Sequence, residues 1–106
     1  MGRSKSASFS HRENRIADLA KALAHPARIA ILEYLAGRSS CMCGSIVDIV
    51  PLSQATVSQH LAELKRVGLI KGETEGPRTC YCIDRQAWDE AHQLLQRFLS
   101  DVKSCC

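Results

Sequence analysis

The chain has 106 residues, 45% of them apolar, and a formal net charge of +3. This length suits one domain with a modest hydrophobic core, which we expect dimerisation to support. No stretch approaches the roughly 20 apolar residues that a membrane span needs, so an integral membrane protein is excluded. The positive charge is compatible with DNA as a partner, but many soluble proteins carry as much.

Six cysteines would also suit a secreted protein held together by disulfides. The segment from Met1 to Ser10 is basic and serine-rich, and it has no apolar run of the kind found in signal peptides. We therefore expect a cytoplasmic protein with reduced thiols. Residues 1–9 are predicted to be a flexible basic tail, and residues 10–106 to form one domain.

Local signals place the first three helices. Ser10 and Glu13 have the spacing of a capping box, so the first helix should begin after Ser10. Pro26 suits the first turn of a second helix, because a proline has no N–H to leave unpaired there. The short apolar segment from Ile46 to Val50, ended by Pro51, predicts a helix of one to two turns.

The helix that follows has the clearest limits in the chain. We expect it from Gln54 to Val67, with Ser53 as its N-cap and Gly68 as the left-handed residue after it. Two segments with alternating side chains, Leu69 to Thr74 and Arg78 to Ile83, then predict a β-hairpin.

The last helix is expected from Arg85 to about Lys103. Its apolar residues recur at spacings of three and four, which is typical of a helix that packs against a partner helix. These residues are Trp88, Ala91, Leu95, Phe98 and Val102.

The order helix, helix, short helix, helix, hairpin, helix predicts a winged helix-turn-helix domain, mainly α with a small β-hairpin. In such a domain the second helix of the motif lays its N-terminal residues in the DNA major groove. The hairpin fits a wing, with Arg78 at its tip placed to contact a phosphate or the minor groove. An ordinary solvated helix face is the alternative for the polar residues. The predicted DNA-binding residues are Ser53, Gln54, Thr56, Ser58, Gln59, His60, Arg66 and Arg78.

Three stretches together form a specific pattern: Ala-His-Pro-Ala-Arg (24–28), Leu-Ser-Gln-Ala-Thr-Val-Ser-Gln-His-Leu (52–61) and Leu-Lys-Arg-Val-Gly-Leu-Ile (64–70). This pattern resembles the ArsR family of bacterial metal-responsive repressors, and the resemblance extends over about residues 12–103. It implies a homodimeric repressor of double-stranded operator DNA, not an enzyme. It also implies that the first and last helices build the dimer, which adds Leu19 and Leu23 to the predicted interface.

The cysteines come in pairs, and thiolates are soft ligands that favour thiophilic ions. Cys41 and Cys43 resemble the Cys-x-Cys of the family's arsenite repressors, but Ile46 stands where those proteins carry a third cysteine. The third sulfur must then come from elsewhere, and the C-terminal pair is the natural donor. The predicted ligands are Cys41, Cys43, Cys105 and Cys106.

The third pair, Cys80 and Cys82, lies on one face of a predicted strand, so these residues could also chelate an ion. A free cysteine more often packs as a small apolar residue, and we favour that interpretation here.

The expected function is a repressor that leaves its operator when As(III) or Sb(III), as arsenite or antimonite, binds cysteine thiolates. No cofactor is expected for DNA binding, and the sequence does not decide whether a structural zinc ion is bound. The alternative on the same fold is a repressor that responds to a soft metal or to thiol oxidation. A thiol-disulfide oxidoreductase is disfavoured, because Cys-x-Cys is not the Cys-x-x-Cys of those enzymes.

Overall fold

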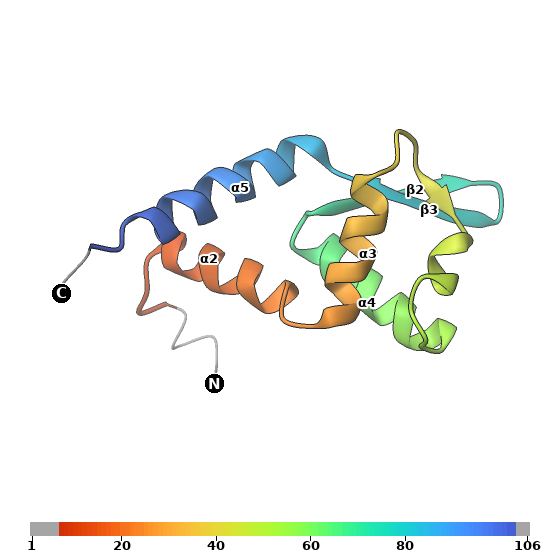
Figure 1. Ribbon diagram of the computed structural model, residues 1–106, viewed down its shortest axis with the longest axis horizontal. Coiled ribbons are helices and arrows are strands. Elements are labelled where there is room, and N and C mark those ends of the chain that lie inside the picture. The colour runs from red at the N-terminus through yellow and green to blue at the C-terminus, as the bar shows by residue number, and fades with distance from the viewer. Residues whose placement is uncertain (1–6, 104–106) are drawn as a thin grey trace.

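The structure is a computed structural model that describes residues 7–103 (Figure 1). It confirms the expected winged helix-turn-helix fold. No helix in this described part is long and apolar enough to cross a membrane. In chain order the elements are helices α2 (His11–Ala22) and α3 (Pro26–Ala36), strand β1 (Met42–Cys43), the 3₁₀ helix η1 (Ser45–Asp48), helix α4 (Gln54–Arg66), strands β2 (Ile70–Glu75) and β3 (Arg78–Ile83), and helix α5 (Arg85–Ser100).

The predicted caps begin the first two helices. Ser10 Oγ accepts a hydrogen bond from the Glu13 N–H, and Glu13 Oε1 accepts one from the Ser10 N–H, each at 3.0 Å. Pro26 occupies the first turn of α3, and His25 Nδ1 accepts from the Ala27 N–H at 3.0 Å. These bonds satisfy backbone donors that a helix start otherwise leaves unpaired.

Helices α3 and α4 form the centre of the molecule, where they pack on each other and on the sheet. Helices α2 and α5 lie beside each other at the end remote from the hairpin tip (Figure 1). Burial of each large apolar side chain stabilises such a core by about 1.5–3 kcal/mol. The largest fully buried side chains are Leu19, Ile31, Leu35, Val57, Leu64 and Ile70.

The sheet has three antiparallel strands in the order β1-β3-β2. The hairpin pairs Ile70 with Ile83 at its base, and Gly76 turns its tip with a positive φ of 62°. Strand β1 was not predicted. It pairs Met42 with Tyr81, and a strand of two residues is too short to show the alternation by which strands are recognised.

Two predicted boundaries are wrong. The short helix is a 3₁₀ turn at Ser45–Asp48, preceded by Gly44 with a φ of 81°. Helix α5 ends at Ser100 rather than at about Lys103, and its last turn closes with a bond from the Asp101 N–H back three residues to the Phe98 carbonyl at 3.4 Å. The row of apolar residues predicted for this helix therefore ends at Phe98, and Val102 lies beyond the helix.

Candidate DNA interface and cysteine cluster

Helix α4 presents a polar face. Val57, Leu61 and Leu64 anchor it in the core, while Gln54, Ser58 and Gln59 are exposed. The apolar anchors fix the rotation of the helix, so the polar side chains of its first two turns point to solvent together. This arrangement fits a helix that reads base edges.

Ser53 and Thr56 organise the start of α4. Ser53 Oγ accepts from the Thr56 N–H at 3.2 Å and donates to Thr56 Oγ1 at 3.0 Å. Both hydroxyls are thus engaged with each other in the free protein. These two bonds fix the start of α4 and so position the polar residues that follow along the helix.

His60 faces inward, unlike the glutamines before it. Its ring centroid lies 4.4 Å from that of His25, and its buried Nε2 has no hydrogen-bond partner among residues 7–103. Burial lowers the pKa of His60, and the positive charges that His25 and Arg28 can carry lower it further. His60 is therefore held as a neutral packing residue at neutral pH.

Arg66, at the other end of α4, joins two helices. Its Nη2 lies 2.8 Å from Asp18 Oδ1 on α2 and 2.8 Å from Glu63 Oε2 on its own helix. The hydrogen bonds to Glu63 and Asp18 raise the pKa of Arg66, and those same bonds lower the carboxyl pKa values. Both carboxylates already bind the guanidinium, so the predicted contact of Arg66 with DNA would compete with these two ion pairs.

The wing carries Arg78 at the first position of β3, opposite Glu75 in the strand register. Arg78 is exposed, as are Gly76 and Pro77 in the turn. An arginine on such a tip is within reach of DNA when α4 enters the major groove. This exposed position at the wing tip is compatible with the predicted contact of Arg78 with a DNA phosphate or the minor groove.

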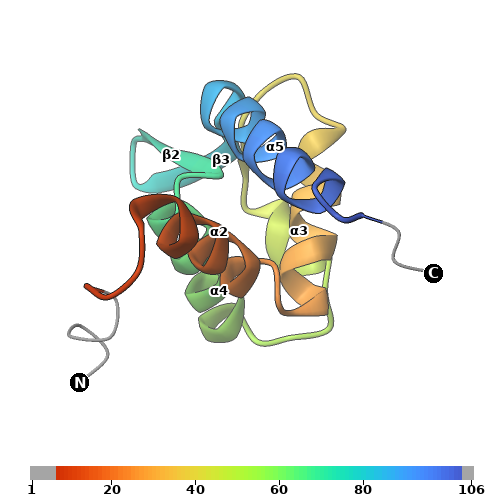
Figure 2. The ribbon, with the colours of Figure 1, turned by 90° about the vertical axis from the view of Figure 1, so that its left-hand side faces the viewer.

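Helices α2 and α5 line an apolar pocket of about 440 Å³ that is open to solvent, and Figure 2 faces the end of the molecule where they lie. The residues predicted for the dimer interface do not share one environment there. Some pack in the protomer's own core, where the two helices contact each other, and the assignment of the set to a dimer interface stays a prediction. They divide into buried Leu19 and Ala91, half-buried Leu23, Trp88 and Leu95, and exposed Phe98 and Val102.

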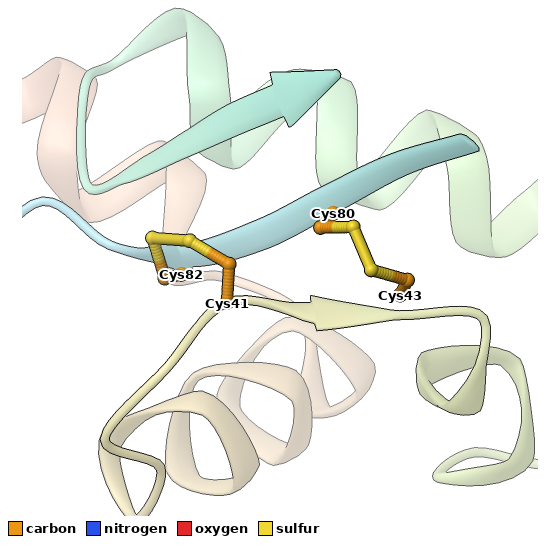
Figure 3. Close-up of a disulfide and its surroundings, with 4 residues drawn as sticks. All are labelled: Cys41, Cys43, Cys80 and Cys82. Atoms are coloured by element: carbon orange, nitrogen blue, oxygen red, sulfur yellow. A yellow bond between two sulfur atoms is a disulfide. The ribbon is translucent and has the colours of Figure 1, made fainter. Parts of the chain in front are cut away.

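Four cysteines meet on β1 and β3. Disulfides join Cys41 to Cys82 and Cys43 to Cys80, with Cα atoms 4.4 and 4.1 Å apart (Figure 3). The register explains both bonds, because it puts Cys43 opposite Cys80 and residues two apart share a face.

This pairing differs from the sequence-based expectation of reduced thiols and of inert packing for Cys80 and Cys82. Both expectations missed β1, whose pairing brings the two Cys-x-Cys motifs together. Cys105 and Cys106 lie outside the described residues, so their part as ligands stays a prediction. Within residues 7–103 no group of three or more His, Cys, Asp or Glu side chains is placed to hold a metal ion.

Known proteins match this chain closely enough to assign a family. A family model for a helix-turn-helix domain matches residues 23–73. The HTH-type transcriptional regulator YgaV of Escherichia coli K12 is 38% identical over 71 residues, which are 67% of this chain and 72% of YgaV. A homodimeric winged helix-turn-helix DNA-binding domain from Mycobacterium bovis, Mb0332, described as a possible ArsR-family regulator, is 30% identical over 90% of each chain, with a TM-score of 0.64. This protein belongs to the ArsR family.

Membership of the ArsR family confirms the resemblance found in the sequence. A further relative, the HTH-type transcriptional repressor SmtB of Mycobacterium tuberculosis, is 41% identical over 64 residues, 60% of this chain and 47% of SmtB. The ArsR-family chain is therefore a DNA-binding transcriptional regulator and not an enzyme.

Proposed function

We propose that this ArsR-family protein is a cytoplasmic homodimer that represses transcription at a two-fold operator, and that arsenite or antimonite releases it by binding cysteine thiolates. The exposed face of α4 and the wing tip support the DNA-binding half. In a dimer the two α4 helices would enter successive major grooves, about one helical turn apart.

Gln59 tests the assignment of α4 as the recognition helix. An operator can be selected from random DNA duplexes, and Gln59→Ala should then weaken binding by about 5- to 150-fold, the range expected when one base contact is lost. The exposed Gln93 on α5 is the matched control, because Gln93→Ala removes the same group from a different helix. Equal effects of the two substitutions would contradict the role of α4.

One observation supports the sensing half: the four-cysteine cluster joins the segment directly before the helix-turn-helix, which carries Cys41 and Cys43, to strand β3 of the wing. Strand β1 leads through Gly44 into η1 and then into α4. A change at the sulfurs would therefore act on the segment that leads into α4 and, through η1, contacts it. Coupling of about 1–3 kcal/mol is usual between such sites.

Metalloid binding requires the reduced chain, since disulfide sulfurs cannot act as thiolate ligands. Cys41 and Cys43 would supply two sulfurs after reduction. Cys80 and Cys82 lie next to them in the strand register, which supports one of this pair as the third donor, and the C-terminal cysteines are the other candidate source.

Titration of operator-bound, reduced protein with arsenite tests the proposal. We expect operator affinity to fall by about 5- to 150-fold. The double variants Cys80→Ser/Cys82→Ser and Cys105→Ser/Cys106→Ser show which pair completes the site, because only the pair that does so should be needed for release. An unchanged affinity in fully reduced protein would overturn the metalloid proposal. Zinc analysis of the same reduced samples shows whether zinc competes for these thiolates.

The two cross-strand disulfides favour a second candidate, in which oxidation itself is the signal. Oxidation covalently joins β1 to β3, and with it the start of the helix-turn-helix to the wing. The oxidised and reduced chains should then differ in operator affinity without any metalloid. Equal affinities, with the disulfides verified by mass spectrometry, would exclude this candidate.

A further inference from the structure

The two disulfides lie on one face of the sheet but have opposite neighbours. Strand β2 pairs Lys71 with Cys82 and Glu73 with Cys80. Since directly opposed residues of antiparallel strands point to the same face, an ammonium group accompanies Cys82 and a carboxylate accompanies Cys80. The Cys41–Cys82 disulfide therefore has more positively charged surroundings than the Cys43–Cys80 disulfide.

The disulfides also differ in access. Cys41 and Cys82 line an open pocket of about 580 Å³, whereas Cys43 and Cys80 do not line it. Cys80 is only 4% exposed. The charged side chains that line the pocket are Arg38, Lys71, Arg85 and Glu73, which leaves an excess of positive charge.

We propose that this pocket binds a low-molecular-weight thiol that carries carboxylates, and that exchange with this thiol opens the Cys41–Cys82 disulfide before Cys43–Cys80. This proposal rests on the thiol-oxidation form of the proposed function and names its reactive pair. A pocket with three cations attracts an anionic thiol and stabilises the thiolate that leaves.

The exchange proceeds in two balanced steps. The thiolate of the small molecule attacks Sγ of Cys41, which lies beside the edge strand β1; the Cys41–Cys82 bond breaks, and Cys82 leaves as a thiolate next to Lys71. A second small thiolate attacks the outer sulfur of the mixed disulfide and releases Cys41 as a thiolate. In sum, two small thiols are oxidised to their disulfide and one protein disulfide is reduced to two thiols. The reverse reaction closes the bond.

Opening this bond removes the outer covalent link between the start of β1 and β3. The inner link, Cys43–Cys80, stays closed, so the sheet keeps its register while the loop before β1 is released. The protein would then respond to the ratio of an anionic thiol to its disulfide, and not to oxidants in general.

The test uses the full chain, oxidised so that both cross-strand disulfides are verified by mass spectrometry. Glutathione, which is anionic, and cysteamine, which is cationic, are compared at equal thiolate concentration, and free thiols are trapped with iodoacetamide and mapped by peptide. We expect Cys41 and Cys82 to be alkylated first, a glutathione adduct on Cys41, and faster opening by glutathione. Lys71→Gln should slow the opening of the Cys41–Cys82 disulfide by glutathione about fivefold at low salt. Glu73→Gln should not slow it, and high salt should reduce the preference for glutathione.

First opening of Cys43–Cys80, equal rates for the two thiols, or equal effects of Lys71→Gln and Glu73→Gln would overturn the proposal. So would a chain that cannot be oxidised to the two cross-strand bonds. Operator affinity is measured on the same samples: if the charge preference is seen while affinity is unchanged, the pocket stands and the proposed redox control of DNA binding fails.

Discussion

Arg66 shows how a single side chain can have two plausible roles. It was predicted to contact DNA, and the structure engages it with Asp18 and Glu63, at the end of α4 opposite the recognition residues. Because Arg66 lowers the pKa of both carboxyls in the folded chain, their contribution to stability is present above the ordinary carboxyl pKa of about 4 and is lost as pH falls through the lowered values.

Arg66→Ala is therefore expected to lower the melting temperature at neutral pH, and to do so less as the pH falls below about 4. Operator affinity should stay close to that of the wild type. Thermal unfolding at several pH values and operator binding at neutral pH measure the two effects. Arg97→Ala, at an exposed position in the last turn of α5, controls for loss of a positive charge. A large loss of affinity with unchanged stability would restore the DNA contact.

The contact between His60 and His25 leads to a second pH effect, at higher pH. Burial lowers the pKa of His60 in the folded chain, helped by His25 and Arg28, so the unfolded chain takes up this proton more readily. Stability from this group is complete above the ordinary histidine pKa of about 6.5 and is lost as pH falls through the lowered value. Denaturant unfolding should show that the free energy of unfolding falls less between pH 7 and pH 5 in His60→Gln than in the wild type. The same slope in both chains would mean that His60 is not the group responsible.

At the scale of elements, the turn from α4 into β2 depends on one glycine. Gly68 has a φ of 89°, and a Cβ added there would meet only Ala87 Cβ at 4.0 Å, so the backbone conformation and not crowding requires glycine. Gly68→Ala should cost about 1–2 kcal/mol. Gly37, with a φ of −85°, is the matched control, and Gly37→Ala should be neutral or stabilise by up to about 1 kcal/mol. Urea unfolding compares them, and similar costs for the two would contradict a conformational cause.

The helices were predictable because their start signals are local. Ser10 with Glu13, Pro26, and Ser53 each act within a few residues of their own helix. Gly68 was likewise predictable, since a left-handed residue after a helix favours glycine. The hairpin strands followed from alternation and a Gly-Pro turn, and β2 and β3 differ from their predicted limits by no more than a residue.

The cysteine cluster was not predictable, since it depends on pairing between segments 37 to 41 residues apart. Alternation correctly placed Cys80 and Cys82 on one face, but nothing in the sequence near Cys41 and Cys43 names β3 as their partner. The Arg66–Asp18 pair, 48 residues apart, was missed for the same reason. Tertiary register, rather than local propensity, decides which chemical groups meet.

At the scale of the molecule, the surface left open by α2 and α5 suits a second copy of the chain. Phe98 is 47% exposed, and the next residue, Leu99, is 67% exposed and lines the apolar pocket between the two helices. Solvent contact of such side chains is unfavourable. Homodimerisation would cover them and would hold two α4 helices at the spacing of an operator. The proposed redox and metalloid signals would then act by changing the distance or angle between these two helices.

Phe98→Glu is expected to yield a folded monomer, because it places a charge in the proposed interface without touching the protomer's core. Sedimentation should show the loss of the dimer at micromolar concentration, while far-UV circular dichroism stays unchanged. Operator affinity should fall by at least about 100-fold, since the two half-sites are no longer bound by one linked molecule. Gln93→Glu, exposed on the same helix, adds the same charge and should leave both properties intact. A dimer that survives Phe98→Glu with full operator affinity would move the interface away from α5.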